Sequence, residues 1–178
     1  FNSPAYTSTT NGINQNVTVN NFTLTDDGVG NWVFSTSNAT PYTFTVNGNL
    51  NRAVNTTIDI NRAASGSQAT TLLIKGNVNS SGIITETNNN TGAVIELGGT
   101  NPSNFNVAGT TLNNDVSLVV NKSPGVNIIC DNTILPNSIN AKLVLTSGNL
   151  DVLTNDKSIF VINPDPNAIV GGSIGSHI

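Results

Sequence analysis

The sequence predicts an all-β protein that winds as a right-handed parallel β-helix, and the first observation behind this prediction is a repeat. A short apolar strand that runs into an Asn- or Gly-containing turn recurs at residues 44–50, 72–78, 94–99, 118–125 and 143–150. The positions that we assign as equivalent in these repeats are Val46, Ile74, Glu96, Val120 and Leu145. They are separated by 28, 22, 24 and 25 residues, a period typical of solenoids whose coils stack on one another.

The second and third observations are alternating apolar residues and the lack of a helical pattern. Period-2 alternation is clear in 42–46, 58–60 and 72–74, whereas no stretch keeps a 3.6-residue period over about ten residues. Short strands separated by frequent Gly, Asn, Ser and Pro clusters would also suit a β-sandwich, which stays open as the alternative fold. The repeat at coil length favours the β-helix.

The elements follow in order along the chain. Residues 1–12 form a polar lead-in, and two short strands at 17–19 and 22–24 flank a bend at Asn20-Asn21. Turn residues at 26–31 precede a strand at 32–34, and the later strands at 118–120, 128–130 and 159–162 are continuous apolar runs. Because the few aromatic residues concentrate before Phe44, we expect one domain over 1–178, with a lead-in or capping coil in 1–40 and stacked coils in 41–178. We expect this domain to be a piece of a longer chain.

The composition limits both the core and the partners. The chain holds 32 Asn and 23 Thr, its charged fraction is only 9% and its net charge is −4. Six scattered basic residues argue against nucleic-acid binding, and no apolar run approaches the roughly 18 residues of a membrane span, so we expect no membrane insertion. Asn suits tight turns and can form ladders between stacked coils, while the lone Cys130 is expected to be a small core residue.

Three C-terminal stretches carry a resemblance to a known group of proteins. Residues 118–130, 141–152 and 159–178 resemble β-helical repeat regions of large secreted, adhesin-like surface proteins of Bacteroidota, which are cargo of type IX secretion. The resemblance covers about residues 105–178. The N-terminal half shares only the general pattern of short strands and Asn-rich turns. It implies an extracellular or cell-surface location and flanking domains of the same polypeptide as partners, but it carries no catalytic residue onto this chain.

Candidate catalytic residues are few. The sole histidine, His177, has no Ser or Cys partner in a recognisable motif, so triad chemistry and a His/Cys zinc site are not expected. Glycoside hydrolysis needs two carboxylates across a cleft, and the best pair is Asp131 with Asp151, followed by Asp156. All three also suit turns, and the two arginines, Arg52 and Arg62, are too few for a cationic lyase site.

The sequence also contains residues of the kinds that bind calcium ions or ice. Asp26-Asp27-Gly28 and Asp165 offer oxygen ligands for a structural calcium ion, although no known calcium motif is present and we expect no cofactor. Thr-x-Thr pairs at 23/25, 43/45 and 85/87 have the form found in ice-binding solenoids, but their uneven spacing favours ordinary β-propensity.

Aromatic side chains near the N-terminus are the candidate ligand-binding residues. Alternation places Trp32 with Phe34 on one face of their strand, and Tyr42 with Phe44 on one face of the next. Trp32 and Tyr42 could form a platform for stacking against sugars, but packing into the first coils is the alternative role.

The sequence therefore favours a non-catalytic structural or adhesive segment of an extracellular bacterial surface protein. A carbohydrate-binding module is the first alternative, with glycans or other surface proteins as partners. A polysaccharide-degrading enzyme is the second.

Overall fold

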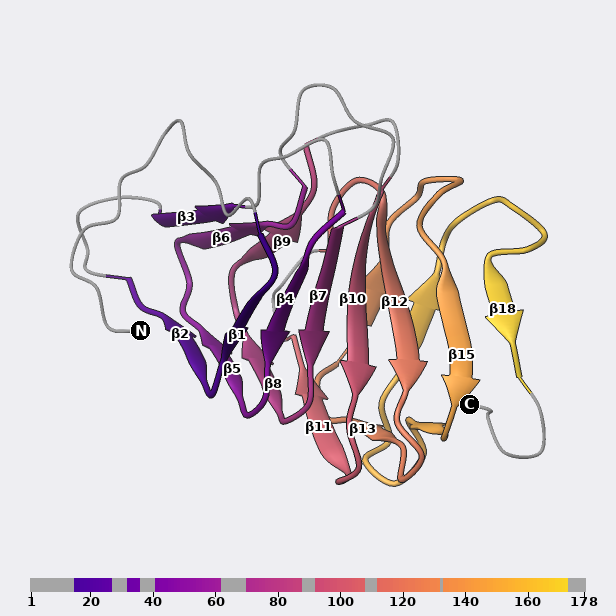
Figure 1. Cartoon of the computed structure of the whole chain (residues 1–178). Helices are drawn as coiled ribbons and strands as arrows, with labels where there is room; N and C mark the ends of the chain where they lie inside the picture. Colours follow the sequence, from indigo (N-terminus) through magenta and orange to yellow (C-terminus); the bar gives the residue numbers. More distant parts are fainter. Residues whose placement is uncertain are drawn as a thin grey trace.

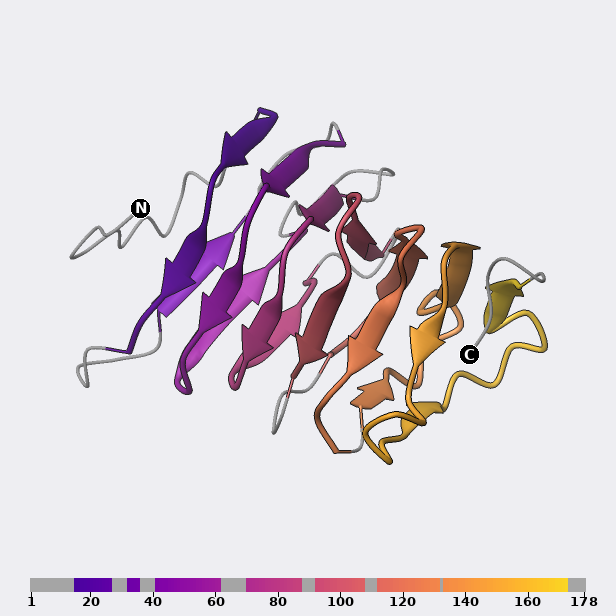
Figure 2. The ribbon, with the colours of Figure 1, turned by 90° about the horizontal axis from the view of Figure 1, so that it is seen from below.

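The computed structural model describes residues 15–26, 32–35, 41–61, 70–87, 92–107, 112–131 and 133–172. These residues form a solenoid with three strand-bearing sides, in which the chain advances by one coil after each circuit (Figures 1 and 2). In Figure 1 the front strands run downward and the rear strands upward while the chain advances from left to right, so the coil is right-handed. The predicted β-helix is confirmed.

The first side is a seven-stranded sheet that contains one strand from each coil. Its strands, in spatial order, are β1 (Val17–Val19), β4 (Thr43–Val46), β7 (Thr70–Ile74), β10 (Ala93–Gly98), β12 (Val116–Asn121), β15 (Leu143–Ser147) and β18 (Ile169–Gly171).

The second side is a six-stranded sheet built from the strand that follows in each coil. Its strands, in chain order, are β2 (Phe22–Leu24), β5 (Leu50–Arg52), β8 (Val78–Ser80), β11 (Ser103–Asn106), β13 (Val126–Ile128) and β16 (Leu150–Asp151).

The third side is divided along the rod. It contains β3 (Trp32–Ser35), β6 (Thr56–Asp59) and β9 (Ile83–Thr85) in one sheet, and β14 (Thr133–Leu135) and β17 (Ile159–Val161) in another. Between them, the single bridge from Ile84 to Leu112 continues the stacking.

Every strand pairing in the described part of the chain is parallel and joins one coil to the next. A β-sandwich is built from antiparallel sheets, so that alternative is rejected. The described residues include no helix long and apolar enough to cross a membrane.

The interior is an aliphatic lumen filled by side chains at equivalent strand positions. Val46, Ile74 and Val120 are completely buried, and Leu97 is 1% exposed. Strand register pairs Ile74 with Leu97 and Leu97 with Val120, so the repeat passes through Leu97 rather than through Glu96 as we expected. The steps from Val46 to Leu145 are therefore 28, 23, 23 and 25 residues. Glu96 faces outward, because a one-residue shift reverses the side of every residue on a strand.

Two smaller expectations about residue types are confirmed. Cys130 is buried and unpaired at 3% exposure. Asn55 and Asn114 adopt positive φ angles of 59°, in the left-handed region that Asn tolerates better than most residues. The rings of Phe22 and Phe44, both buried, meet edge to face at 5.3 Å.

Candidate functional site

A row of asparagines crosses the coils where the strands of the six-stranded sheet begin. We call this row the Asn ladder; its members are Asn21, Asn49, Asn77, Asn104 and Asn127. In its first three rungs the backbone N–H of one Asn donates to the side-chain oxygen of the equivalent Asn in the preceding coil, at 2.8, 2.9 and 2.9 Å. In the fourth, Asn127 Nδ2 donates to Asn104 Oδ1 at 3.2 Å. The predicted Asn ladder is therefore present, and it connects coil to coil.

Two basic side chains lie inside the solenoid instead of on its surface. Arg52 is 4% exposed, and its Nη1 donates to the carbonyl oxygens of Thr56 and Ile83, both at 2.6 Å. Its Nε and Nη2 donate to Ser80 Oγ at 2.9 and 2.7 Å. Burial lowers the pKa of Arg52 to about 10.

Lys122 is the second buried cation. It is fully buried, and Nζ donates to the carbonyl oxygens of Lys75 and Asn101, each at 2.8 Å. Burial lowers its pKa as well. Both side chains act as braces, because each ties the backbone of neighbouring coils together at a corner of the rod.

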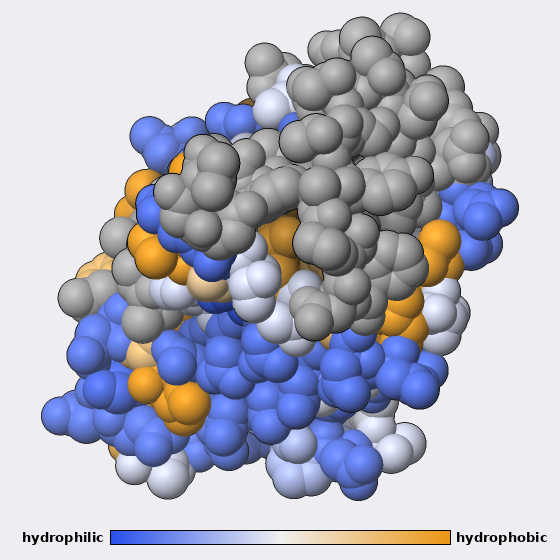
Figure 3. All heavy atoms as spheres, turned by 90° about the vertical axis from the view of Figure 1, so that its left-hand side faces the viewer, coloured by the Kyte–Doolittle hydropathy of each residue, from blue (hydrophilic) through white to orange (hydrophobic). Residues whose placement is uncertain are grey.

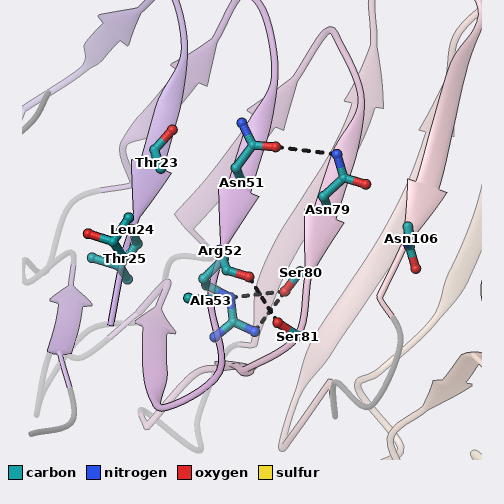
Figure 4. A pocket seen from close by; sticks show the side chains of 10 residues that line it. All are labelled: Thr23, Leu24, Thr25, Asn51, Arg52, Ala53, Asn79, Ser80, Ser81 and Asn106. Carbon is teal, nitrogen blue, oxygen red and sulfur yellow. Dashed lines mark hydrogen bonds between the residues drawn. The ribbon is translucent and has the colours of Figure 1, made fainter. Parts of the chain in front are cut away.

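An open depression of about 330 Å³ lies at the ends of β2, β5 and β8, beside Arg52 (Figure 4). We call it the Arg52 depression. Its lining residues are Thr23, Leu24, Thr25, Asn51, Arg52, Ala53, Asn79, Ser80, Ser81 and Asn106.

Trp32 and Tyr42 lie on different sides of the solenoid. Trp32 begins β3 on the third side, in register with Thr56, whereas Tyr42 directly precedes β4 of the seven-stranded sheet. Tyr42 is half-buried, and its carbonyl oxygen accepts the N–H of Thr71 at 2.9 Å. By alternation Tyr42 shares the inward side with Phe44, which favours packing for Tyr42. Seen from the N-terminal end, the coloured surface is mainly hydrophilic with separate apolar patches (Figure 3). A sugar platform at Trp32 stays a prediction.

The carboxylates considered for catalysis are engaged in turns and ion pairs. Asp151 accepts the N–H groups of Leu153 and Thr154, both at 3.0 Å, and the Thr154 hydroxyl. These hydrogen bonds, chiefly those from Thr154, lower the pKa of Asp151. Asp131 pairs with Lys157 at 2.7 Å, which raises the pKa of Lys157. Asp156 sits in a turn with φ of 52°.

The remaining candidate sites are dispersed. Asp26 belongs to the first coil and accepts from Asn55 Nδ2 at 2.8 Å, whereas Asp165 lies near the other end and is 3.8 Å from Lys142 Nζ. Within the described ranges, no group of three or more His, Cys, Asp or Glu side chains is placed to hold a metal ion. Asp27, Arg62 and His177 lie outside the described residues.

The three Thr-x-Thr pairs fall on three different sides of the solenoid. Thr23 is on β2 and Thr25 follows it, Thr43 and Thr45 are on β4, and Thr85 is on β9 with Thr87 beyond. They therefore cannot form one ladder, in agreement with the β-propensity explanation.

Arg52 and Lys122 are the residues that sequence reasoning missed. Alternation from Leu50 places Arg52 inward, and alternation from Leu118 and Val120 does the same for Lys122. The signal was present, but charged side chains are rarely assigned to a core.

No protein-family model, curated protein or solved structure matches this chain.

Proposed function

We propose that this chain is a rigid, non-catalytic rod segment of an extracellular bacterial surface protein, which spaces and carries flanking domains of the same polypeptide. The observation that carries the proposal is the continuous coil-to-coil bonding. Parallel strand pairs link neighbouring coils, and the Asn ladder adds side-chain bonds along the same direction.

The arrangement suits a spacer for a mechanical reason. Neighbouring parallel strands lie about 4.8 Å apart, so each coil adds that length to the rod. The hydrogen bonds between strands run along the rod, and several act together at each boundary between coils. A load between the ends is therefore distributed over the sheets, with Arg52 and Lys122 bracing two corners.

Two observations support a role without chemistry. The best candidate carboxylates are already engaged: Asp131 pairs with Lys157, and Asp151 accepts hydrogen bonds from donors in its own turn. Asp151 also has a lowered pKa, the opposite of what a general acid for glycoside hydrolysis requires. The extracellular setting rests on the resemblance of residues 118–130, 141–152 and 159–178 to secreted repeat regions.

The experiment compares two fusion proteins displayed on beads. One carries this chain between its surface anchor and a binding domain, the head, and the other carries a flexible Gly/Ser linker of 178 residues in the same place. The measured quantity is the height of the head above the bead surface. The solenoid should hold the head at a fixed height that is insensitive to salt, whereas the flexible linker should give a broad height distribution. Equal distributions would overturn the spacer role.

A parallel assay tests whether the chain cleaves polysaccharides. We expect no release of reducing ends from a panel of polysaccharides. Turnover that disappears in Asp151→Asn, with the fold retained, would show that the chain is an enzyme.

A further inference from the structure

The Arg52 depression combines a concave surface with a buried cation that has no charged partner among the described residues. All four hydrogen bonds of the guanidinium go to neutral oxygens: Ser80 Oγ twice, and the carbonyls of Thr56 and Ile83. A guanidinium has five N–H groups, so one N–H of Nη2 is left after these bonds. Desolvation without a counter-charge is unfavourable, and the lowered pKa of Arg52 has burial as its cause.

Polar groups suited to hydroxylated ligands lie beside this cation. Thr23, Asn51 and Asn79 are in register on β2, β5 and β8, and Asn106 pairs with Asn79 on β11. Asn79 Nδ2 donates to Asn51 Oδ1 at 3.3 Å (Figure 4). This bond leaves a donor, Asn51 Nδ2, and an acceptor, Asn79 Oδ1, without a hydrogen-bond partner in the described part of the chain, and both residues line the depression.

The arrangement favours one ligand chemistry. A carboxylate forms its strongest hydrogen bonds with a guanidinium, and it would supply the missing negative charge. Side-chain amides and hydroxyls in a row, about 4.8 Å apart, are suited to hydrogen-bonding successive hydroxyl groups. The depression has no aromatic lining residue, so stacking on a ring does not contribute there.

We propose that the Arg52 depression binds an acidic saccharide, with the sugar carboxylate directed toward the remaining Nη2 N–H of Arg52 and the sugar hydroxyls along Asn51 and Asn79. The site differs from the Trp32 and Tyr42 platform predicted from sequence. The site would let the rod bind a glycan beside its six-stranded sheet. Loss of glycan binding would leave the proposed spacer role intact.

The test is an NMR titration of the whole chain at low salt with a trisaccharide of hexuronic acids, followed through the side-chain amides of Asn51 and Asn79 and the Nε–H of Arg52. We expect saturable shifts of these three signals. A neutral hexose trisaccharide and acetate, each at the same concentration, should cause much smaller shifts.

Variants then separate a local site from general electrostatics. Asn79→Asp places a negative charge at the depression without touching the Arg52 brace, and it should weaken binding at least tenfold while the melting temperature stays unchanged. Asn104→Asp is the matched control, because Asn104 is exposed on the same sheet, keeps its acceptor oxygen and does not line the depression. It should bind like the parent.

Several results would overturn the proposal. One is the lack of saturable shifts with the acidic trisaccharide. Others are equal shifts with the neutral trisaccharide or with acetate, which would remove the need for a charged sugar. Equal weakening in Asn79→Asp and Asn104→Asp would reduce the effect to overall charge.

Discussion

Removing one rung of the Asn ladder tests whether these side chains hold the coils together. Asn49 Oδ1 accepts the backbone N–H of Asn77 at 2.9 Å, in a part-buried position, while the N–H of Asn49 itself donates to Asn21 Oδ1. In Asn49→Ala the Asn77 N–H loses its acceptor. A lost hydrogen bond of this kind, with a partly buried donor left unpaired, costs about 1–2 kcal/mol.

Two matched variants separate the effect of losing this hydrogen bond from the effect of replacing an asparagine. Asn51→Ala removes an Asn two positions further along. Among the described residues its side-chain oxygen accepts only the exposed 3.3 Å bond from Asn79, so this variant should cost less than about 0.5 kcal/mol. Asn49→Asp keeps an acceptor oxygen and should recover most of the lost stability.

The assay has a local and a global readout. Amide hydrogen exchange should show protection of the Asn77 N–H falling about five- to thirtyfold in Asn49→Ala, the equivalent of 1–2 kcal/mol. Urea unfolding should show a matching decrease in the free energy of unfolding. Equal effects of Asn49→Ala and Asn51→Ala, or an Asn49→Asp variant as weak as the Ala variant, would refute the role of the ladder.

Three further predictions concern the turns, the buried cation and the register. Gly148 has φ of 73° and a Cβ there would overlap the carbonyl oxygen of Lys122, so Gly148→Ala should cost about 2 kcal/mol or more in thermal unfolding, with Gly172→Ala as a comparison. Because burial lowers the pKa of Lys122 below 10.5, the unfolded chain binds more protons between the lowered pKa and 10.5. Stability relative to Lys122→Met should therefore rise with pH in that window, and a falling difference would contradict the sign. Leu97→Ala should cost about 2–5 kcal/mol, whereas Glu96→Ala should stay within about 0.5 kcal/mol; the reverse order would contradict the observed register.

The fold was predictable from two agreeing patterns in the sequence. The strand repeat gives the length of a coil, and the alternation of apolar residues identifies the strands within it. The error at Glu96 arose from aligning the repeats on their Gly turns. Alternation of buried Ala93, Ile95 and Leu97 with half-buried Val94 and Glu96 identifies the inward residues correctly. The end of β12 shows why the turns are a poor guide: Val120 pairs with Leu145, but the register then shifts by one residue and Asn121 pairs with Ser147, so the distance in sequence from inward strand positions to the turn varies between coils.

The candidate site was less predictable, since it depends on relations between coils. Arg52 and Ser80 are 28 residues apart, and they meet because β5 and β8 pair in register. Sequence patterns indicated which side of the strand each residue faces, but not that a buried cation would use backbone carbonyls as partners. The separation of Trp32 and Tyr42 onto different sides likewise depends on strand pairing, since β3 pairs with β6 and β4 pairs with β7.

The most direct test of the rod is to pull the folded chain from both ends in an optical trap. Coils of 23–28 residues, each released as a unit, should give steps of about 80–100 Å as the freed segments extend. Repeated steps of this size, each at a defined force, are what the coil-to-coil bonding predicts. Smooth extension at low force, like that of an unstructured linker, would contradict the rigid rod.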